Sequence, residues 1–219
     1  TGISPEQKED TMKMPNIAIG GYGRSGCDIH GAFLRSKDND ICNVVAVVEY
    51  DPARAEAARK DFGCDTYSDY RELFHRTDID FVTNASYSNE HFPVALDLLN
   101  HGFNVLCEKP LCKSPEQVQQ LMDAAKAHNC ELTIFHQYRY NDYYLEMKKL
   151  LDKKVLGDVK LVRARQNFFA RRYDWQTLLY REGGAMRNNA AHTIEQIIDL
   201  AGSDELPESH SCMEIWNSV

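Results

Sequence analysis

The stretch Asn16-Ile-Ala-Ile-Gly-Gly-Tyr-Gly-Arg-Ser-Gly26 decides the fold of this chain. Its first four residues are an apolar run that stops at glycines, which is typical of a buried strand entering a tight turn. Three of its glycines form the pattern G-x-G-x-x-G, and a helix is predicted directly after it, over residues 25–35. In that setting the first glycine permits the turn, the second lets the backbone approach a pyrophosphate, and the third lets the helix pack against the strand. The candidate cofactor-binding residues of this loop are Gly21, Tyr22, Gly23, Arg24, Ser25 and Gly26.

An acidic residue follows the glycine loop at the expected distance. Glu49 comes directly after a second buried strand, Val44–Val48, and lies 23 residues after Gly26. A carboxylate at this place accepts hydrogen bonds from the ribose hydroxyls and repels a 2′-phosphate. The next residue is Tyr50 and not an arginine, so the sequence favours NAD over NADP, with Glu49 and Tyr50 as cofactor residues. The alternative is a plain glycine turn with Glu49 facing solvent.

Strand and helix patterns alternate over residues 15–135. Asp51-Pro52 marks a helix start after the second strand, and further strands are predicted over 81–85, 104–107 and 131–135. Such alternation predicts right-handed βαβ units and a parallel sheet covered by helices on both faces. The expected organisation is a disordered tail over 1–13, a dinucleotide-binding domain over 14–135 and a partial α/β domain for substrate and oligomerisation over 136–219.

Composition excludes several classes of protein. The chain of 219 residues has 25 Lys and Arg against 33 Asp and Glu, a net charge of −8, whereas nucleic-acid-binding domains carry a basic excess. No window approaches the length of apolar sequence that a membrane span needs, and residues 1–13 lack the apolar core of a signal peptide. Seven cysteines without a Cys-x-x-Cys pair indicate a reduced, cytoplasmic protein. The histidines and cysteines show no metal-ligand spacing.

A second motif points to a known family. The sequence runs from Asn89-x-His91 through Ala95, Gly102 and Val105 to Glu108-Lys109-Pro110. Together with the glycine loop, this arrangement resembles the Gfo/Idh/MocA oxidoreductase family over nearly all of residues 14–205. The resemblance implies an α/β fold, with an N-terminal Rossmann domain and then a second α/β domain built on a large, open, mostly antiparallel sheet. It also implies a nicotinamide cofactor and oxidation or reduction of a carbon of a sugar, inositol or similar polyol.

The same resemblance assigns a role to Lys109. It implies that Lys109 lies beside the nicotinamide and the substrate hydroxyl, where its charge would polarise a carbonyl or stabilise a developing alkoxide. A partly desolvated lysine also loses its proton more easily. Glu108 and Pro110 are implied to border the cofactor, and the bond before Pro110 is often cis in this family. The alternative for Lys109 is a lysine at a strand end in solvent.

The stretch Gly183-Gly-Ala-Met-Arg-Asn-Asn-Ala-Ala-His192 resembles the family's glycine-rich loop and the Asp-x-x-x-His start of its next helix. The histidine matches, but Asn188 occupies the aspartate position. In a helix these two residues are i, i+4 neighbours on one face, a polar face opposite an inward stripe of Ile194, Ile197 and Ile198. His192 is then the candidate proton acceptor, and Asn188 orients a sugar hydroxyl. The alternative for His192 is a capping or structural role.

Further candidates follow two strands and precede the second glycine loop. The resemblance places the dinucleotide over the residues after the strand 81–85 and the nicotinamide beside the segment 136–139. A basic and aromatic cluster precedes the Gly-Gly pair and would suit the binding of a sugar acid or phosphosugar. The alternative is a solvated loop anchored by its tryptophan. The cofactor candidates are Ala85, Ser86, Asn89, His91 and Gln137, and the substrate candidates are Arg139, Arg171, Arg172, Tyr173 and Trp175.

The leading hypothesis is an NAD-dependent dehydrogenase acting on a sugar, sugar acid or cyclitol. Two alternatives stay open. One is redox-assisted glycoside cleavage with tightly held NAD. The other is a non-catalytic NAD-binding or regulatory protein, which is favoured by Asn188 in place of the family's aspartate and opposed by the presence of Lys109 and His192. A helix over 142–154, a strand over 159–169 and a helix over 190–201 are predicted in the second part. The family implies further strands beyond these, so the second domain is expected to be incomplete and a homo-oligomer is left open.

Overall fold

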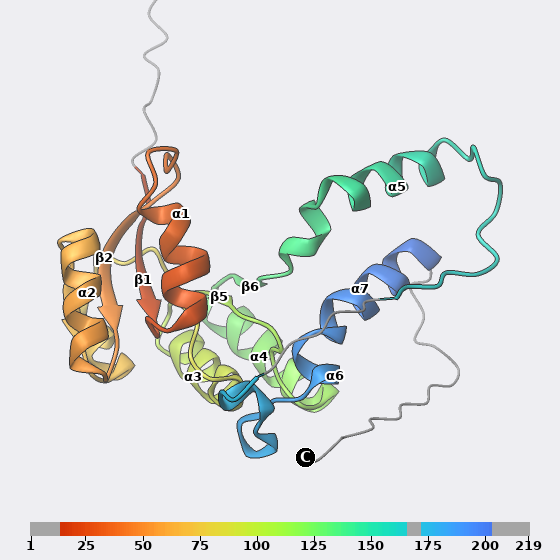
Figure 1. Cartoon of the computed structure of the whole chain (residues 1–219). Helices are drawn as coiled ribbons and strands as arrows, with labels where there is room; N and C mark the ends of the chain where they lie inside the picture. The colour runs from red at the N-terminus through yellow and green to blue at the C-terminus, as the bar shows by residue number, and fades with distance from the viewer. Residues whose placement is uncertain (1–13, 166–171, 203–219) are drawn as a thin grey trace, which may run out of the picture.

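The computed structural model describes residues 14–165 and 172–202, and its centre is a parallel sheet of six strands (Figure 1). The strand order is β3-β2-β1-β4-β5-β6, so the chain starts in the middle of the sheet, winds to one edge and returns to build the other. Every strand pair is parallel. This confirms the predicted doubly wound α/β fold. The strands are β1 Asn16–Gly20, β2 Asn43–Val48, β3 Asp65–Tyr67, β4 Phe81–Asn84, β5 Asn104–Cys107 and β6 Leu132–Ile134.

Alternate side chains of β1 enter two separate cores. Ile17 and Ile19 pack on one face of the sheet with Ala58 of α2 (Pro52–Phe62), whereas Ala18 packs on the other face with Leu98 of α3 (Ser88–Asn100). Because successive strand residues point to opposite faces, a strand that is apolar throughout must be covered on both sides. The first face is covered by η1 (Arg24–Gly31), α1 (Ala32–Leu34) and α2, and the second by α3 and α4 (Pro115–His128) (Figure 1).

The helices around the sheet begin and end where short-range signals place them. Asp51 caps α2 (Pro52–Phe62) by accepting the N–H groups of its first turn, and Gly63 ends it at a φ of +64°. Ser114 caps α4 (Pro115–His128) in the same way. The helix α3 spans Ser88–Asn100, and the short 3₁₀ helix η2 spans Tyr70–His75.

The helix after the glycine loop differs from a regular α-helix. Its first part, η1 (Arg24–Gly31), is π-helical, and only α1 (Ala32–Leu34) is α-helical. Gly26 and Gly31 permit this, since a Cβ on Gly31 would lie 2.8 Å from the carbonyl oxygen of Gly26. Wider π turns occur frequently at functional sites, and this one begins at the loop that the sequence assigns to a cofactor.

The second part of the chain sends two helices, α5 and α7, away from the sheet (Figure 1). Tyr144 and Lys148 of α5 both bind the carboxylate of Asp199 on α7, the lysine at 2.8 Å. This confirms the helices predicted over 142–154 and 190–201. The elements are η3 Gln137–Tyr140, α5 Asp142–Asp152, η4 Trp175–Thr177, η5 Leu179–Arg181, α6 Ala185–Asn188 and α7 Ala190–Ala201.

Two predictions for this second part are wrong. In α7 the polar face is the inward one: His192 and Gln196 are buried, whereas Ile194 and Ile198 are 39% and 41% exposed. The polar face packs against tyrosines of η3 and α5, which offer hydroxyl and carbonyl groups that an isoleucine stripe cannot use. The strand predicted over 159–169 does not form in its described residues 159–165, where no neighbouring strand pairs with it, and the rest lies outside the described residues.

Candidate functional site

A cavity of about 590 Å³ opens at the carboxyl ends of the strands. It lies where β1 and β4 are neighbours and the winding of the sheet reverses, which is the place where doubly wound sheets bind ligands. Residues that follow each of the six strands line it, together with residues of the segment 172–192. Among the predicted residues that line it are Gly21, Gly23, Arg24, Ser25, Glu49, Tyr50, Ala85, Ser86, His91, Glu108, Lys109, Gln137, Arg172, Trp175, Asn188 and His192.

The glycine loop has the shape of a phosphate cradle. Gly21 has a φ of +94°, and a Cβ there would lie 2.7 Å from the carbonyl oxygen of Ala85. A Cβ on Gly26 would lie 1.9 Å from the carbonyl oxygen of Gly21, so neither position admits another residue without a shift. Gly23 has nothing within 4 Å of the place of its missing Cβ and lines the cavity. The loop therefore leaves an open backbone face for a dinucleotide, and the residues present fit such a cofactor.

Glu49 is buried and bound to the protein, not free in the cavity. Its Oε2 accepts the N–H of Tyr22 at 2.9 Å, and its Oε1 accepts the N–H of Asp51 and an Nη2 hydrogen of Arg54, each at 2.9 Å. The alternative of a solvent-facing Glu49 is therefore wrong. Tyr22, a predicted cofactor residue, does not line the cavity. Its hydroxyl bonds instead to Asp61 and Arg35.

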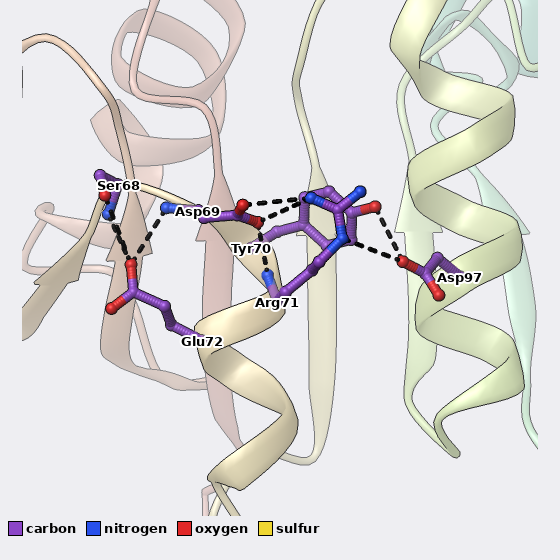
Figure 2. A network of polar contacts seen from close by, with 6 residues as sticks. All are labelled: Ser68, Asp69, Tyr70, Arg71, Glu72 and Asp97. Atoms are coloured by element: carbon purple, nitrogen blue, oxygen red, sulfur yellow. Dashed lines mark hydrogen bonds and ion pairs between the residues drawn. The ribbon is translucent and has the colours of Figure 1, made fainter.

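Four residues after β3 that line the cavity, Ser68 to Arg71, belong to a polar network (Figure 2). Asp69 caps η2 and accepts the N–H of Arg71 at 2.9 Å, while Glu72 accepts the N–H groups of Ser68 and Asp69. The guanidinium of Arg71 lies 4.7 Å from the centre of the Tyr70 ring. Sequence reasoning missed these cavity residues, although the capping box Asp69-x-x-Glu72 is a readable signal.

Glu108 joins the glycine loop to β5. Its Oε1 accepts the hydroxyl of Ser25 and lies 3.0 Å from Nε2 of His30. Burial alone would raise the pKa of Glu108, but these hydrogen bonds outweigh it and hold the pKa below its usual range. The carboxylate thus fixes the helix start beside the phosphate cradle.

Lys109 lies inside the cavity, and its ammonium group is hydrogen-bonded to Asn188. Its Nζ donates to the backbone oxygen of Asn188 at 2.7 Å and lies 3.1 Å from Asn188 Oδ1. Burial is the main cause that lowers the pKa of Lys109, and the nearby charges of Arg24 and Arg172 lower it further, against the opposing effect of Glu108. The alternative of a strand-end lysine in solvent is therefore wrong. The Lys109–Pro110 bond is cis, as the family resemblance implied.

Asn188 is oriented by a residue that sequence reasoning missed. Its Nδ2 donates to Oε1 of Gln176, which also accepts from Arg172. Gln176 is buried, and Gly183 passes so close to it that a Cβ on Gly183 would lie 2.3 Å from the Gln176 carbonyl oxygen. Because the amide nitrogen of Asn188 faces Gln176, its oxygen faces Lys109. An isolated glutamine gives no sequence signal for this role.

His192 is buried in the cavity wall. Its ring stacks on Tyr138, with 4.1 Å between the ring centres, and the ring of His136 lies 5.8 Å away. Burial lowers the pKa of His192 to about 4, and the charge of Lys109 adds to this shift. Asn189 interrupts the helix between Asn188 and His192, so the two residues end α6 and begin α7 instead of sharing one continuous helix.

His91 links two cavity loops by hydrogen bonds. Its Nδ1 lies 2.7 Å from the carbonyl oxygen of Pro110 and its Nε2 lies 3.1 Å from that of Ser86. Burial lowers the pKa of His91. The neighbouring Asn89 has a buried Oδ1 without a hydrogen-bond partner among the described residues, as has Oε1 of Gln137 in the cavity wall. Gln137 lines the cavity and the predicted cofactor residue Asn89 does not. The unpaired acceptor of Gln137 therefore fits a site that takes a polar ligand.

The structure does not bring every predicted residue into the cavity. Arg139 pairs with Glu195 at the surface, and Tyr173 is 90% exposed. Arg171 lies outside the described residues. Trp175 does line the cavity, and its ring meets Tyr87 edge-on at 5.1 Å. Of the predicted basic and aromatic cluster, Arg172 and Trp175 therefore face the site and Tyr173 does not.

Over residues 14–165 and 172–202, no group of three His, Cys, Asp or Glu side chains is arranged to hold a metal ion. In the same ranges no helix combines the length and apolar character that a bilayer crossing requires.

Known proteins resemble this chain over the regions just described. The family model GFO_IDH_MocA, described as an oxidoreductase family with an NAD-binding Rossmann fold, matches residues 15–136. A trans-1,2-dihydrobenzene-1,2-diol dehydrogenase of Xenopus tropicalis is 32% identical over 169 residues, which are 76% of this chain and 50% of the relative. A scyllo-inositol 2-dehydrogenase (NADP(+)) of Bacillus subtilis is 24% identical over 92% of this chain and 55% of its own length.

A solved structure gives the same result. The scyllo-inositol dehydrogenase of Lactobacillus casei, crystallised with NAD(H) and scyllo-inositol, superposes with a TM-score of 0.61 at 28% identity, over 67% of this chain and 43% of its own. The chain thus spans about half the length of the relatives that it matches. Its glycine loop, its strand order and its Glu-Lys-Pro stretch all lie within or beside the matched region, and the chain belongs to the Gfo/Idh/MocA oxidoreductase family with its NAD-binding Rossmann fold.

Proposed function

We propose that this protein is an NAD(H)-dependent dehydrogenase that acts on a secondary hydroxyl of a sugar, sugar acid or cyclitol. One observation carries the proposal: Lys109, held at Asn188, lies in the same cavity as the glycine loop and the buried His192. Bound NAD would supply the hydride acceptor or donor. The names of the relatives, an inositol dehydrogenase and a cyclic diol dehydrogenase, support a ring substrate with adjacent hydroxyls.

The residues of the cavity divide into a cofactor end and a reaction end. Backbone N–H groups of the glycine loop and the start of η1 are suited to the pyrophosphate. The ribose end is formed by Glu49 and Tyr50, and Ala85 and Ser86 lie between the two ends. The nicotinamide end is bounded by Glu108, Lys109, Pro110 and Gln137.

At the reaction end, two side chains would stabilise the developing charge and accept the proton. The Lys109 ammonium would stabilise negative charge on the substrate oxygen as the proton leaves it. His192, whose pKa is lowered to about 4, is unprotonated at physiological pH and is the proposed proton acceptor. The stack on Tyr138 keeps its ring in one orientation. Asn188, Arg172 and Trp175 border the space left for a sugar ring, and the arginine would suit a carboxylate or phosphate substituent.

We further propose that residues 14–135 bind the dinucleotide and that residues 136–219 contribute to the substrate side. The six cysteines of the described residues are all unpaired, which supports a reducing compartment and hence the cytoplasm.

The decisive experiment measures cofactor binding and turnover separately. NADH and NADPH are titrated by nicotinamide fluorescence, and NADH production is then followed with inositols, cyclic diols, sugars and sugar acids. In Lys109→Ala, kcat should fall by about 10²- to 10⁴-fold, while the Kd for NADH stays within about twofold. The matched control is Lys113→Ala, which removes a half-exposed lysine paired with Glu182.

Three other outcomes would each contradict part of this proposal. Unchanged turnover in Lys109→Ala would refute the assigned role of Lys109. NADH binding without turnover of any substrate would favour a non-catalytic nicotinamide-binding protein. Cofactor retained through purification, with glycoside cleavage and no net NADH production, would favour redox-assisted glycoside cleavage.

A further inference from the structure

Three buried polar atoms near the reaction end have no hydrogen-bond partner among the described residues. They are Nδ1 of His192, Nδ1 of His136 and Oε2 of Glu195. The two histidine rings meet nearly edge-on with 5.8 Å between their centres, and His136 Nδ1 lies 4.0 Å from Glu195 Oε2. A buried polar group without a partner costs free energy. Three such groups side by side are explained if a proton moves between them.

His136 lies outside the cavity that His192 lines. Its side chain is nevertheless 22% exposed, so it is in contact with solvent. The ring of His192 is held in place by its stack on Tyr138, which lies in η3 two residues after His136. A histidine ring takes a proton at one nitrogen and gives one up from the other. A proton passed from His192 to His136 therefore leaves the cavity without crossing the space for the substrate.

The charges around the two rings favour this direction of transfer. Burial, and after it the charge of Lys109, lowers the pKa of His192 to about 4. Burial also lowers the pKa of His136, but there the carboxylate of Glu195 opposes the effect of burial. Three further charges act on the pKa of His136 more weakly: Arg139 and Lys109 lower it, and Glu108 raises it. A proton is thus repelled from His192 by a cation and attracted to His136 by an anion.

Glu195 is anchored through its other carboxylate oxygen. Its Oε1 accepts from Nε of Arg139, whose side chain is half exposed. This contact leaves Oε2 unpaired beside His136. The 4.0 Å between His136 Nδ1 and Glu195 Oε2 is longer than a hydrogen bond, and a proton on His136 would draw the two groups together as a charge-assisted pair.

We propose that His136, supported by Glu195, is a positioning residue for proton release, which receives from His192 the proton of the substrate hydroxyl. This inference rests on the proposed function. Oxidation of a secondary hydroxyl by NAD passes a hydride to the nicotinamide and releases one proton. That proton moves from the substrate oxygen to His192, from the other ring nitrogen of His192 to His136, and from His136 to solvent, each transfer being direct or through one water. The side chain of Asn188 takes up no proton and offers no other route.

The kinetic test compares proton release with hydride transfer in single turnovers. NADH absorbance reports the hydride, and a pH indicator in weakly buffered solution reports the proton. In the unaltered protein the two signals should rise together, whereas in His136→Gln the proton signal should lag behind the NADH signal. In the steady state kcat should fall by about tenfold or more, and the Kd for NADH should stay within about twofold.

A rescue and a control separate this role from a structural one. Added imidazole supplies the missing base and should restore much of the lost kcat in His136→Gln, which a damaged fold would not allow. His128→Gln changes a histidine at an exposed position, and it should show neither the lag nor a response to imidazole. A melting temperature for each variant shows whether it is folded.

A second measurement needs no substrate and does not alter His136. An NMR titration of the His136 ring should give a lower pKa in Glu195→Gln than in the unaltered chain, because an amide replaces the carboxylate that faces the ring. The matched control is Glu146→Gln, at an exposed glutamate paired with Lys149, and it should leave the pKa of His136 unchanged. If His136→Gln does not fold, this titration and the proton lag of Glu195→Gln decide.

The outcomes separate this inference from the proposed function. Proton release that keeps pace with NADH formation in folded His136→Gln would overturn the inference while the dehydrogenase activity stands. A loss of kcat that imidazole does not restore would overturn it as well, as would an unchanged pKa of His136 in Glu195→Gln. Absence of turnover in the unaltered protein would instead overturn the proposed function, and with it the proton route.

Discussion

Lys109 Nζ donates to the backbone oxygen of Asn188 at 2.7 Å and lies 3.1 Å from its side-chain oxygen, although 79 residues separate the two in sequence. The contact joins the end of β5 to the end of α6. It gives the buried ammonium group two neutral acceptors, where an aspartate at position 188 would have given it a carboxylate. Burial therefore lowers the pKa of Lys109, and residue 188 provides no negative charge that would oppose this effect.

The first prediction follows from that contact. Asn188→Asp places a carboxylate beside Nζ, which should raise the pKa of Lys109. An alkaline limb of kcat/KM that reports loss of the Lys109 proton should then move to higher pH. The rate at which Lys109 reacts with an acylating reagent, measured against pH, checks the shift without any turnover. An unchanged profile in both measurements would contradict the prediction.

The glycine loop offers a matched pair of variants. A Cβ at position 26 would lie 1.9 Å from the Gly21 carbonyl oxygen, so Gly26→Ala should destabilise the fold by about 2 kcal/mol or more. A Cβ at position 23 meets nothing within 4 Å, so Gly23→Ala should leave stability within about 0.5 kcal/mol. It should weaken NADH binding instead, because the methyl group enters the space left for the pyrophosphate.

Chemical denaturation and nicotinamide fluorescence measure the two effects separately. The pair is informative because the two glycines belong to the same motif but should fail in different assays. Equal loss of stability in both variants would mean that the loop is packed on all sides and does not form an open cradle.

The buried His192 predicts a dependence of stability on pH. Its pKa is lowered to about 4 in the folded chain, whereas in the unfolded chain it lies near the usual value of about 6.5. As the pH falls the unfolded chain therefore takes up the proton first. The stability contribution of neutral His192 is complete above about pH 6.5 and is lost progressively as the pH falls toward 4.

Melting temperatures measured between pH 7.5 and pH 4.5 test this, with His192→Asn as the variant. The variant should lose less stability over this interval than the unaltered chain. His128→Asn, at an exposed position, serves as the control and should behave like the unaltered chain. If all three proteins lose stability in parallel, His192 does not titrate in this range.

Gln176 predicts a positioning effect on catalysis. Gln176→Leu removes the oxygen that accepts from Asn188 and Arg172, so the Asn188 amide is free to turn away from Lys109. On the proposed function, kcat should fall by about ten- to a hundredfold and the Kd for NADH should stay within about twofold. Gln176→Glu keeps the acceptor and should restore most of kcat. Equal losses in the two variants, or loss of NADH binding, would indicate a general structural role.

Much of the fold could be read from the sequence because its signals are local. The apolar run before Gly21, the caps at Asp51 and Ser114 and the alternation of elements each act over a few residues. The short strand β3, Asp65–Tyr67, escaped prediction because three residues carry too little pattern, and it forms by pairing with β2. The helix after the glycine loop was placed correctly, but its π-helical geometry depends on close contacts between glycine backbones.

The predicted orientation of α7 was wrong because its apolar pattern does not identify the element against which it packs. The isoleucines of α7 form a clear stripe, yet the buried face of that helix is the one with His192 and Gln196. Periodicity identifies the two faces of a helix but does not say which neighbour each will meet. The tyrosines of η3 and α5 decide this, since they bind or stack on the polar side chains of α7.

The sequence by itself determined that this chain has a dinucleotide-type glycine loop, an acidic residue after the second strand, and a lysine and a histidine in the motifs of an oxidoreductase family. Only the tertiary structure decided that Glu49 already binds Arg54, that Gln176 orients Asn188, and that Lys109 and His192 share one cavity. The physical reason is distance along the chain. Motifs record the backbone conformations and chemistry of neighbouring residues, whereas hydrogen-bond saturation and burial depend on groups that only folding brings together.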